Sequence, residues 1–113
     1  MKLPGVERAV IEPAKVRDYL LSSGHPVGRF KAAFFRSLGY LESDWPRLLN
    51  DLRSMAETFE ATPGQDSEYG EKYEVRGTLE GPSGARASVI TVWIVLAHED
   101  TPRLVTAYPG AER

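Results

Sequence analysis

The sequence contains no cysteine, and that absence excludes several kinds of chemistry at once. Disulfide bonds, thiolate nucleophiles and cysteine-ligated zinc sites all require this side chain. Histidine is nearly as scarce, because the chain has only His25 and His98, which lie far apart in the sequence. A histidine-rich metal site is therefore not expected. The sequence also has neither a glycine-rich phosphate loop nor a nucleophile elbow, and we expect no metal and no cofactor.

Long hydrophobic runs are missing as well. The longest apolar-rich stretch, residues 89–97, has about half the length that a membrane-spanning helix needs. The first residues lead into Glu7 and Arg8 rather than into an apolar run, so no signal peptide is expected. The net charge of −2 does not suggest a surface that coats nucleic acid or membranes, although a local basic patch is compatible with it. We expect a soluble, cytoplasmic protein with no membrane partner.

The length of 113 residues and the hydrophobic content of 42% are typical of one compact domain, which we expect to span residues 1–113. The first half of the chain has helical periodicity, with apolar side chains recurring every three or four residues. Pro13 and Pro46 suit a first helical turn, and Gly39 suits a helix end. Three helices are predicted: at residues 14–22, from a turn at residues 25–28 to residue 38, and at residues 45–58.

The second half changes to the two-residue periodicity of strands. From Tyr69 to Glu80 apolar side chains occupy odd positions and polar ones even positions, so one face should be buried. Residues 89–96 are apolar on both faces, which indicates a central strand covered on two sides. A short apolar run at residues 9–11 predicts an extra strand or an extended arm, and the polar residues 61–68 predict a mobile loop. The main strands are expected at residues 69–80, 85–98 and 103–108, with turns at residues 81–84 and 98–102.

This order predicts an α+β fold, with two or three N-terminal helices packed on one face of a three- to four-stranded antiparallel sheet. Residues able to do chemistry are scattered over it rather than gathered in one motif. Period two places Thr91 and Trp93 on one face, and likewise Thr106 and Tyr108 on one face. The strand register, which the sequence does not give, decides whether the two pairs meet.

Metal-independent cleavage of RNA is the chemistry that these residue types can supply together. His25, at the entrance of the second helix, would take the proton from a ribose 2′-hydroxyl or give one to the leaving oxygen, because imidazole titrates near neutral pH. Lys31, Lys72 and Arg86 would face the phosphate and stabilise the charge that builds on it.

Hydroxyl and aromatic side chains would complete such a site. Thr91, Thr106 and Tyr108 would position the scissile group. Tyr69 or Trp93 would stack a base of the RNA. The hypothesis requires the imidazole, the lysine of the second helix and at least one of the three hydroxyls to surround one open cleft.

Each candidate also has a purely structural interpretation. His25 would hydrogen-bond the turn before the second helix, and Lys31 would extend along the surface. Arg86 would pair across strands with a glutamate, and Trp93 would fill the core. The threonines would then be present for strand propensity alone.

Several runs of the sequence resemble an uncharacterised bacterial domain family of unknown function, and together they cover nearly the whole chain. The main motif is His-Pro-Val-Gly-Arg-Phe-Lys-Ala at residues 25–32. The resemblance implies a domain that occurs both as a small free-standing protein and as a C-terminal module of larger proteins, including toxin-like ones. It implies no activity. The other runs are residues 15–21, 38–40, 69–73, 91–93 and 102–109.

The closing run Leu-Val-Thr-Ala-Tyr-Pro, at residues 104–109, is also similar to the last strand of barnase, colicin and RelE-like toxin ribonucleases. Those proteins have N-terminal helices followed by an antiparallel sheet, and they cleave RNA without metal using His, Lys, Arg, Thr and Tyr side chains. This resemblance implies RNA as the partner. The charge balance of the present chain departs from the basic surface typical of such nucleases.

Three hypotheses of function remain open. The leading one is a metal-independent, toxin-like endoribonuclease or a degenerate relative of one. The second is a non-catalytic interaction module, such as an immunity-like protein, whose partner or inhibitor is another protein. The third is an enzyme acting on a small metabolite, with His25 and Lys31 gripping an anion.

Overall fold

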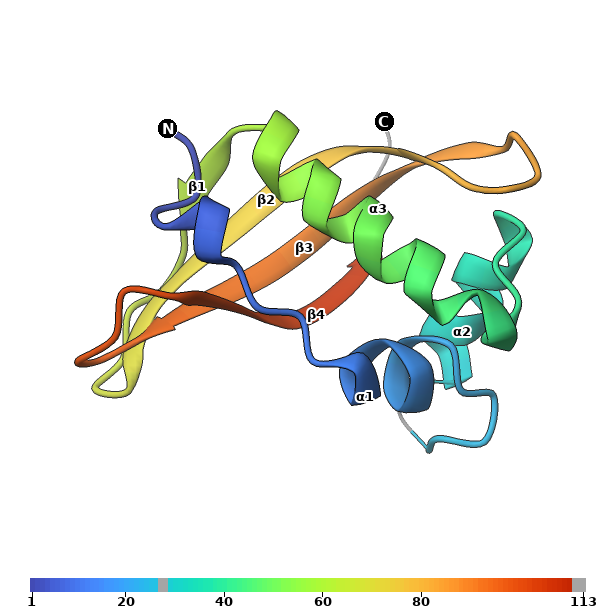
Figure 1. Cartoon of the computed structure of the whole chain (residues 1–113), viewed down its shortest axis with the longest axis horizontal. Helices are drawn as coiled ribbons and strands as arrows, with labels where there is room; N and C mark the ends of the chain where they lie inside the picture. Colours follow the sequence, from blue (N-terminus) through green and yellow to red (C-terminus); the bar gives the residue numbers. More distant parts are fainter. Residues whose placement is uncertain (27–28, 111–113) are drawn as a thin grey trace.

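The computed structural model describes residues 1–26 and 29–110. It has two layers, an antiparallel sheet and a set of helices, which confirms the predicted α+β class (Figure 1). The longest helix runs along one face of the sheet, the helical segments of residues 13–20 and 29–44 gather at one end, and the short helix of residues 6–8 lies toward the other end. No helix in the described part of the chain is long and apolar enough to cross a membrane. The helical elements are η1 (Val6–Arg8), α1 (Pro13–Lys15), η2 (Val16–Leu20), α2 (Arg29–Ser37), η3 (Glu42–Asp44) and α3 (Trp45–Thr58).

The sheet has four strands in the order β1-β2-β3-β4, and each strand is antiparallel to its neighbours. The three long strands lie within one or two residues of the predicted bounds. The strand β1 was not predicted, because its residues fall in the polar stretch assigned to a loop. Ala61 in this strand is buried and pairs with Val75, while Thr62 and Pro63 face solvent. The bounds are β1 (Ala61–Pro63), β2 (Gly70–Glu80), β3 (Arg86–Leu96) and β4 (Pro102–Pro109).

One face of the sheet forms the core with the helices. Tyr73, Val75 and Leu79, at odd positions of β2, are buried as predicted, and α3 lies against this strand, whereas Tyr69, the first odd position of the predicted strand, is exposed. The helical spacing predicted for α3 is also confirmed, because its buried residues form one stripe. This core face includes Tyr73, Val75, Leu79, Val89, Thr91, Trp93, Leu104 and Ala107 from the strands, and Leu48, Leu52, Met55 and Ala56 from α3.

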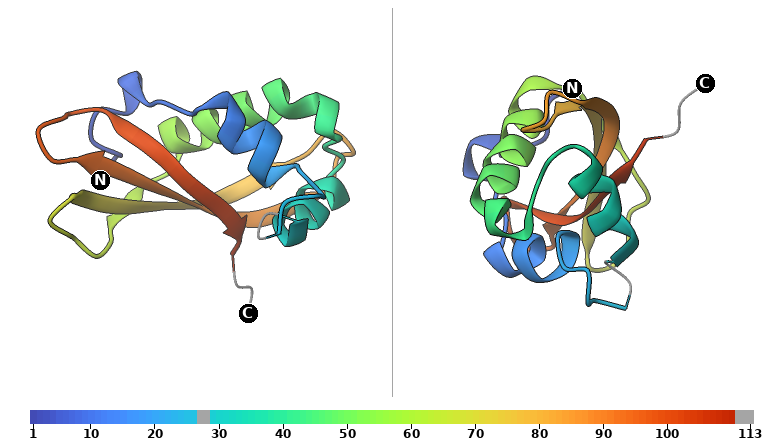
Figure 2. Two further views of the ribbon diagram at one scale, coloured as in Figure 1. Left: turned by 90° about the horizontal axis from the view of Figure 1, so that it is seen from below. Right: turned by 90° about the vertical axis from the view of Figure 1, so that its right-hand side faces the viewer.

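The opposite face of the sheet, which we call the open face, lies away from α3 (Figure 2), and α2 borders it where this helix contacts β4. The prediction that β3 is covered on both sides is therefore met only in part. Ile90 on this face is only 6% exposed, but Val92 and Ile94 are half-buried. Lys72 and Arg76 of β2 are exposed there.

The first predicted helix is divided into two parts with different windings. After the short α1, residues Val16–Leu20 form a π-helix, in which the amide of Leu21 donates to the carbonyl oxygen of Val16 at 3.0 Å. Val16 and Leu20 are fully buried, so this wide turn is fixed by the core. Single π-turns are rare and often occur at functional sites.

The run at residues 9–11 is an extended arm that lies parallel to the start of β4. The amide of Val10 donates to the carbonyl oxygen of Pro102 at 2.9 Å, and the amide of Leu104 donates to that of Val10 at 3.0 Å. This confirms the extended-arm alternative, because only a single bridge forms. The arm ties the N-terminal segment to the last strand.

The turn between β2 and β3 packs directly against the end of α2. The backbone amide and the hydroxyl of Ser83 both donate to the carbonyl oxygen of Leu38, at 3.2 and 3.0 Å. Gly81 is buried here, and a Cβ at this position would overlap that same oxygen. The predicted turn at residues 81–84 is thus confirmed, and it holds α2 at one end of the sheet.

Candidate active site

The candidate site is built around Tyr19, the fourth residue of η2. The ring of His25 packs edge-on against the phenol ring, with 5.0 Å between the centroids and an interplanar angle of 80°. Lys31 of α2 places its Nζ 5.5 Å from the Tyr19 centroid, and Lys15 of α1 places its Nζ 5.7 Å away. Three separate segments therefore bring an imidazole and two ammonium groups to one phenol.

The last strand supplies a hydroxyl to the same place. Thr106 of β4 lies close enough to the Tyr19 hydroxyl to lower the pKa of the phenol, and the nearby charges of Lys31 and Lys15 act in the same direction, against partial burial. The two hydroxyl groups of Tyr19 and Thr106 are close, but their geometry is not that of a full hydrogen bond. The Thr106 Oγ1 is buried, and no atom of residues 1–26 or 29–110 completes a hydrogen bond with it. We call Tyr19, His25, Lys31 and Thr106 the Tyr19 cluster.

A hollow of about 690 Å³ opens beside this cluster, and both Tyr19 and His25 line it. His25 is half-buried at the border of this hollow. Asp18 lines the same hollow, where its carboxylate accepts two hydrogen bonds from Arg17 at 3.0 and 2.9 Å. These bonds lower the pKa of Asp18 and keep it ionised. The remaining lining residues are Glu12, Ala14 and Lys15.

The predicted turn at residues 25–28 can be followed only in part. Val27 and Gly28 lie outside the described residues. Across them, the amide of Arg29 donates to the carbonyl oxygen of His25 at 3.0 Å, so the imidazole sits at the entrance of α2 as expected. The helix α2 contacts both η2 and β4.

Tyr108 lies on the same face of β4 as Thr106, as the two-residue period predicted. It pairs with Ile90 and is half-buried, on the open face of the sheet. Thr106 pairs with Val92 on that face. Two residues of strand separate the two side chains by about 7 Å, so Tyr108 lies next to the Tyr19 cluster.

Thr91 and Trp93 lie on the other side of the sheet. Both are 0% exposed. The Thr91 Oγ1 donates to the carbonyl oxygen of Val75 at 3.2 Å and accepts from the Trp93 Nε1 at 2.8 Å. Contact with a substrate, which the sequence interpretation gave to both residues, is not compatible with complete burial. The structural interpretation of Trp93 as a core residue is the one that the geometry supports.

Tyr69, Lys72 and Arg86 do not join the cluster. Tyr69 is 68% exposed and precedes Gly70, which pairs with the last residue of β3. Arg86 begins β3 six residues before Val92, the partner of Thr106, and so lies roughly 20 Å from that pair along the strand. Its Nε lies 3.4 Å from an oxygen of Glu80, so it makes the cross-strand pair that the structural interpretation expected. Lys72 is exposed on the open face.

The sequence interpretation missed Tyr19 and Lys15. Tyr19 fits the apolar stripe of the first helix and was assigned to packing on that basis. A tyrosine at the edge of an apolar stripe between two lysines is a weak signal, because it is equally typical of a surface aromatic. Among the described residues, no group of three or more His, Asp or Glu side chains has an arrangement that could hold a metal ion.

Comparison with known proteins places this geometry in context. Residues 2–111 match a family described as a domain of unknown function, DUF6883, which bears out the first resemblance found in the sequence. No curated protein matches the chain. One similar solved structure is a chain of a contact-dependent growth inhibition toxin–immunity protein complex from Klebsiella pneumoniae 342. The two chains superpose with a TM-score of 0.70 at 19% identity, over 96% of this chain and 98% of the other. At this identity the likeness establishes a shared fold.

Proposed function

We propose that this chain, which belongs to the DUF6883 family of domains of unknown function, is a toxin-like endoribonuclease that works without a metal. The observation that carries the proposal is the convergence of His25, Lys31 and Thr106 on Tyr19. These residues come from a turn, a helix and the last strand. Their meeting beside an open hollow is the arrangement that the chemistry requires.

In the proposed reaction His25 removes the proton from a ribose 2′-hydroxyl. The 2′-oxygen then attacks the adjacent phosphorus, and the bond from phosphorus to the 5′-oxygen of the next nucleotide breaks. Tyr19 gives its proton to that leaving oxygen, because its lowered pKa makes the phenol a stronger acid than a free tyrosine. The products are a 2′,3′-cyclic phosphate and a free 5′-hydroxyl, and exchange with water returns both side chains to their starting states.

The remaining residues of the site act on charge and position. Lys31 stabilises both the phosphorane and the phenolate, and Lys15 adds a second positive charge on the Tyr19 ring. The Thr106 Oγ1 is buried beside the Tyr19 hydroxyl, so it acts on the reaction through Tyr19, by positioning the phenol and stabilising the charge that develops on it. Tyr108 lies on the same face of β4 and orients the neighbouring part of the substrate.

A second candidate function is a non-catalytic module that binds a protein. The similar structure belongs to a complex in which a growth inhibition toxin and an immunity protein are associated, so either role brings a protein partner. Phe30 favours a docking role, because it is 70% exposed at the start of α2 beside the Arg29 guanidinium, 4.8 Å from its ring. If the chain is only a protein-binding module, it should not cleave RNA.

The deciding experiment incubates the purified chain with total RNA at neutral pH, with and without a chelator. We expect cleavage in both conditions and fragments that end in 2′,3′-cyclic phosphate. The substitution His25→Ala should slow cleavage by about 10²- to 10⁴-fold. The matched control is His98→Ala, which removes the other imidazole, exposed on the turn between β3 and β4. Intact RNA in both conditions would rule out the nuclease and leave the protein-binding role.

A further inference from the structure

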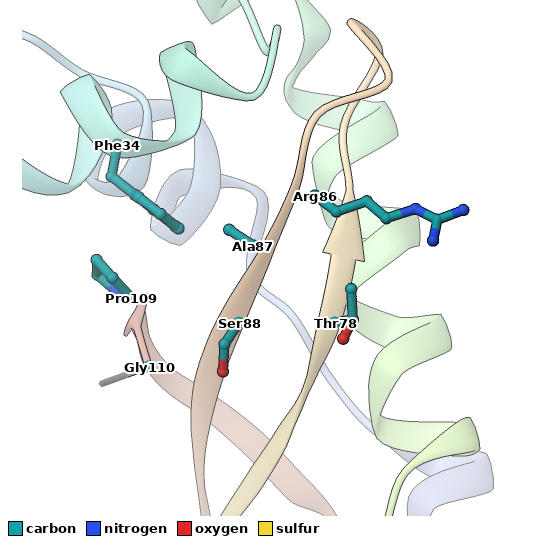
Figure 3. Close-up of a pocket in the computed structure, with 7 residues that line it drawn as sticks. All are labelled: Phe34, Thr78, Arg86, Ala87, Ser88, Pro109 and Gly110. Carbon is teal, nitrogen blue, oxygen red and sulfur yellow. The ribbon is translucent and has the colours of Figure 1, made fainter. Parts of the chain in front are cut away.

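A second hollow, of about 530 Å³, lies between α2 and the ends of β3 and β4 (Figure 3). We call it the Phe34 pocket. Its volume falls within the range of small-molecule sites in proteins. None of the sequence candidates except Arg86 borders it. The lining residues are Phe34, Thr78, Arg86, Ala87, Ser88, Pro109 and Gly110.

One side of the pocket is apolar and rigid. The ring of Phe34 extends from α2 toward Ala87 and Pro109 (Figure 3). This ring packs edge-on against the buried Phe35, with 5.1 Å between centroids, so its orientation is fixed by the core. A fixed aromatic ring with aliphatic neighbours is a surface on which a flat heterocycle can stack.

The other side of the pocket is polar. Thr78 and Ser88 are direct cross-strand neighbours on the open face, and their hydroxyls can each donate or accept a hydrogen bond. Figure 3 shows the Arg86 guanidinium directed away from the pocket, in agreement with its ion pair to Glu80. Arg86 therefore contributes only the base of its side chain.

A different arginine lies at the mouth of the pocket. A Cβ on Gly110 would lie 2.6 Å from the Arg76 Nη1 and would also collide with the Ser88 Oγ. The guanidinium of Arg76 thus reaches across β3 to the end of β4. Arg76 is exposed, and no ion pair joins it to a described acidic residue. Its charge is available to a phosphate.

The pocket adjoins the Tyr19 cluster through two elements. Lys31 of the cluster and Phe34 of the pocket are one turn apart on the same side of α2. Pro109 and Gly110 follow Thr106 and Tyr108 directly along β4. The same two elements therefore border both the pocket and the cluster.

We propose that the Phe34 pocket holds one nucleobase of the RNA, stacked on Phe34, while Arg76 binds the phosphate attached to that nucleotide. This inference rests on the proposed nuclease function and names the part of the site that selects the base. The hydroxyls of Thr78 and Ser88 read the edge of the base.

The test measures binding separately from cleavage. Each of the four nucleoside 3′-monophosphates is titrated into the ¹⁵N-labelled chain, and we expect amide shifts at Thr78, Ser88 and Gly110. Phe34→Leu should weaken binding by about tenfold, the usual worth of one stacked base. Phe30→Leu, which removes an exposed ring of the same helix, should leave it unchanged. Gly110→Ala is a second variant that fills the pocket without touching the core, and it should also weaken binding.

Arg76→Ala separates the phosphate contact from the base contact. It should weaken binding of the 3′-monophosphate and leave binding of the free nucleoside unchanged. In RNA cleavage, Phe34→Leu should redistribute the cut sites among bases, whereas His25→Ala should slow cutting at all sites and keep nucleotide binding.

The possible failures are distinguishable. Nucleotide binding that depends on Phe34, combined with intact RNA, would support the pocket and overturn the nuclease. The opposite failure is also recognisable. If Phe34→Leu cleaves RNA with unchanged base preference, and nucleotides do not shift the amide signals of the pocket, the pocket proposal is wrong and the nuclease proposal stands.

Discussion

Thr91 and Thr106 are of one residue type, lie on neighbouring strands and face opposite sides of the sheet. The Thr91 hydroxyl has both a donor and an acceptor partner inside the core. The Thr106 hydroxyl is buried at the edge of the candidate site without a completed bond among the described residues. Because a buried polar group costs free energy when it is unpaired, the two threonines should respond in opposite ways to the same substitution.

Thr91→Val should lower the free energy of unfolding by about 1–3 kcal/mol, because it leaves the Trp93 indole N–H and the Val75 carbonyl oxygen without their partner. Urea denaturation followed by tryptophan fluorescence measures this. Thr91→Ser keeps the hydroxyl and should lose less than Thr91→Val. An unchanged midpoint in Thr91→Val would contradict the hydrogen bonds described.

Thr106→Val should leave the free energy of unfolding unchanged or raise it slightly, because it replaces an unpaired buried hydroxyl with a methyl group of similar shape. Cleavage of RNA should nevertheless fall by about 10²-fold, the usual effect of losing one hydrogen-bond donor to a developing charge. Thermal unfolding and cleavage rates are measured on the same sample. Equal losses in both would show that Thr106 is only structural.

The Tyr19 phenol should ionise at a lower pH than an ordinary tyrosine, whose pKa is about 10. The folded pKa is the lowered one, so ionisation of Tyr19 stabilises the fold fully above about pH 10, and this contribution is lost as the pH falls through the folded pKa. Ultraviolet absorbance of the phenolate, compared between the native chain and Tyr19→Phe, isolates this one group. Lys31→Met should raise the pKa of Tyr19, and a titration that stays unchanged would argue against contact between the two.

At the scale of elements, periodicity alone locates most of the fold. Apolar and polar side chains alternate clearly along β2 because one face of the strand is packed against the core and the other faces solvent. The helix α3 has a single apolar stripe for the same reason. The strand β1 lacks such a pattern, since only Ala61 of its three residues is buried. The π-helix cannot be read from spacing, because its winding is imposed by the burial of Val16 and Leu20.

The candidate site is harder to predict than the fold because it depends on how elements meet. His25 and Lys31 could be proposed from their place at the start of a helix, and Thr106 from its strand. Their assembly depends on Tyr19, which the wide turn of η2 directs toward β4. Thr91 was mistaken for a site residue because strand alternation does not tell which face is covered.

The contact between α2 and the turn of residues 81–84 should be sensitive to one added methyl group. Gly81→Ala would force the new Cβ against the Leu38 carbonyl oxygen and should lower the free energy of unfolding by about 1–3 kcal/mol. The control is Gly24→Ala, whose Cβ would meet only the Ser22 Oγ, at 4.0 Å. Denaturant unfolding of the two variants makes the comparison. Equal stability would mean that the turn moves aside freely.

At the scale of the whole molecule, the net charge of −2 conceals an uneven distribution. Lys31 lies at the Tyr19 cluster, and Lys72 and Arg76 lie on the open face, without an ion pair to any described acidic residue. Carboxylates gather at the far end of the sheet, around a hollow of about 420 Å³. The acidic residues that line this hollow are Asp66, Glu68, Glu71 and Glu99.

This distribution predicts that RNA binding weakens with salt. For the His25→Ala variant and a short single-stranded RNA, the logarithm of the association constant should fall with the logarithm of salt concentration with a slope of about −2, from three phosphate contacts. Arg76→Ala should reduce the slope by about 0.7. Fluorescence anisotropy at several salt concentrations measures it, with Arg47→Ala of α3, which pairs with Asp51, as the control. A slope that Arg76→Ala leaves unchanged would remove this residue from the interface.

The arm at residues 9–11 has a consequence for how copies of the chain behave toward one another. A bare outer strand is a template on which further chains can polymerise. Here Val10 occupies the outer side of β4, and at the opposite border β1 has only three residues and includes Pro63, which has no amide hydrogen to donate. Neither edge of the sheet therefore offers a long free strand for pairing with another chain. The protein can thus keep one broad face bare for other molecules without growing into fibres.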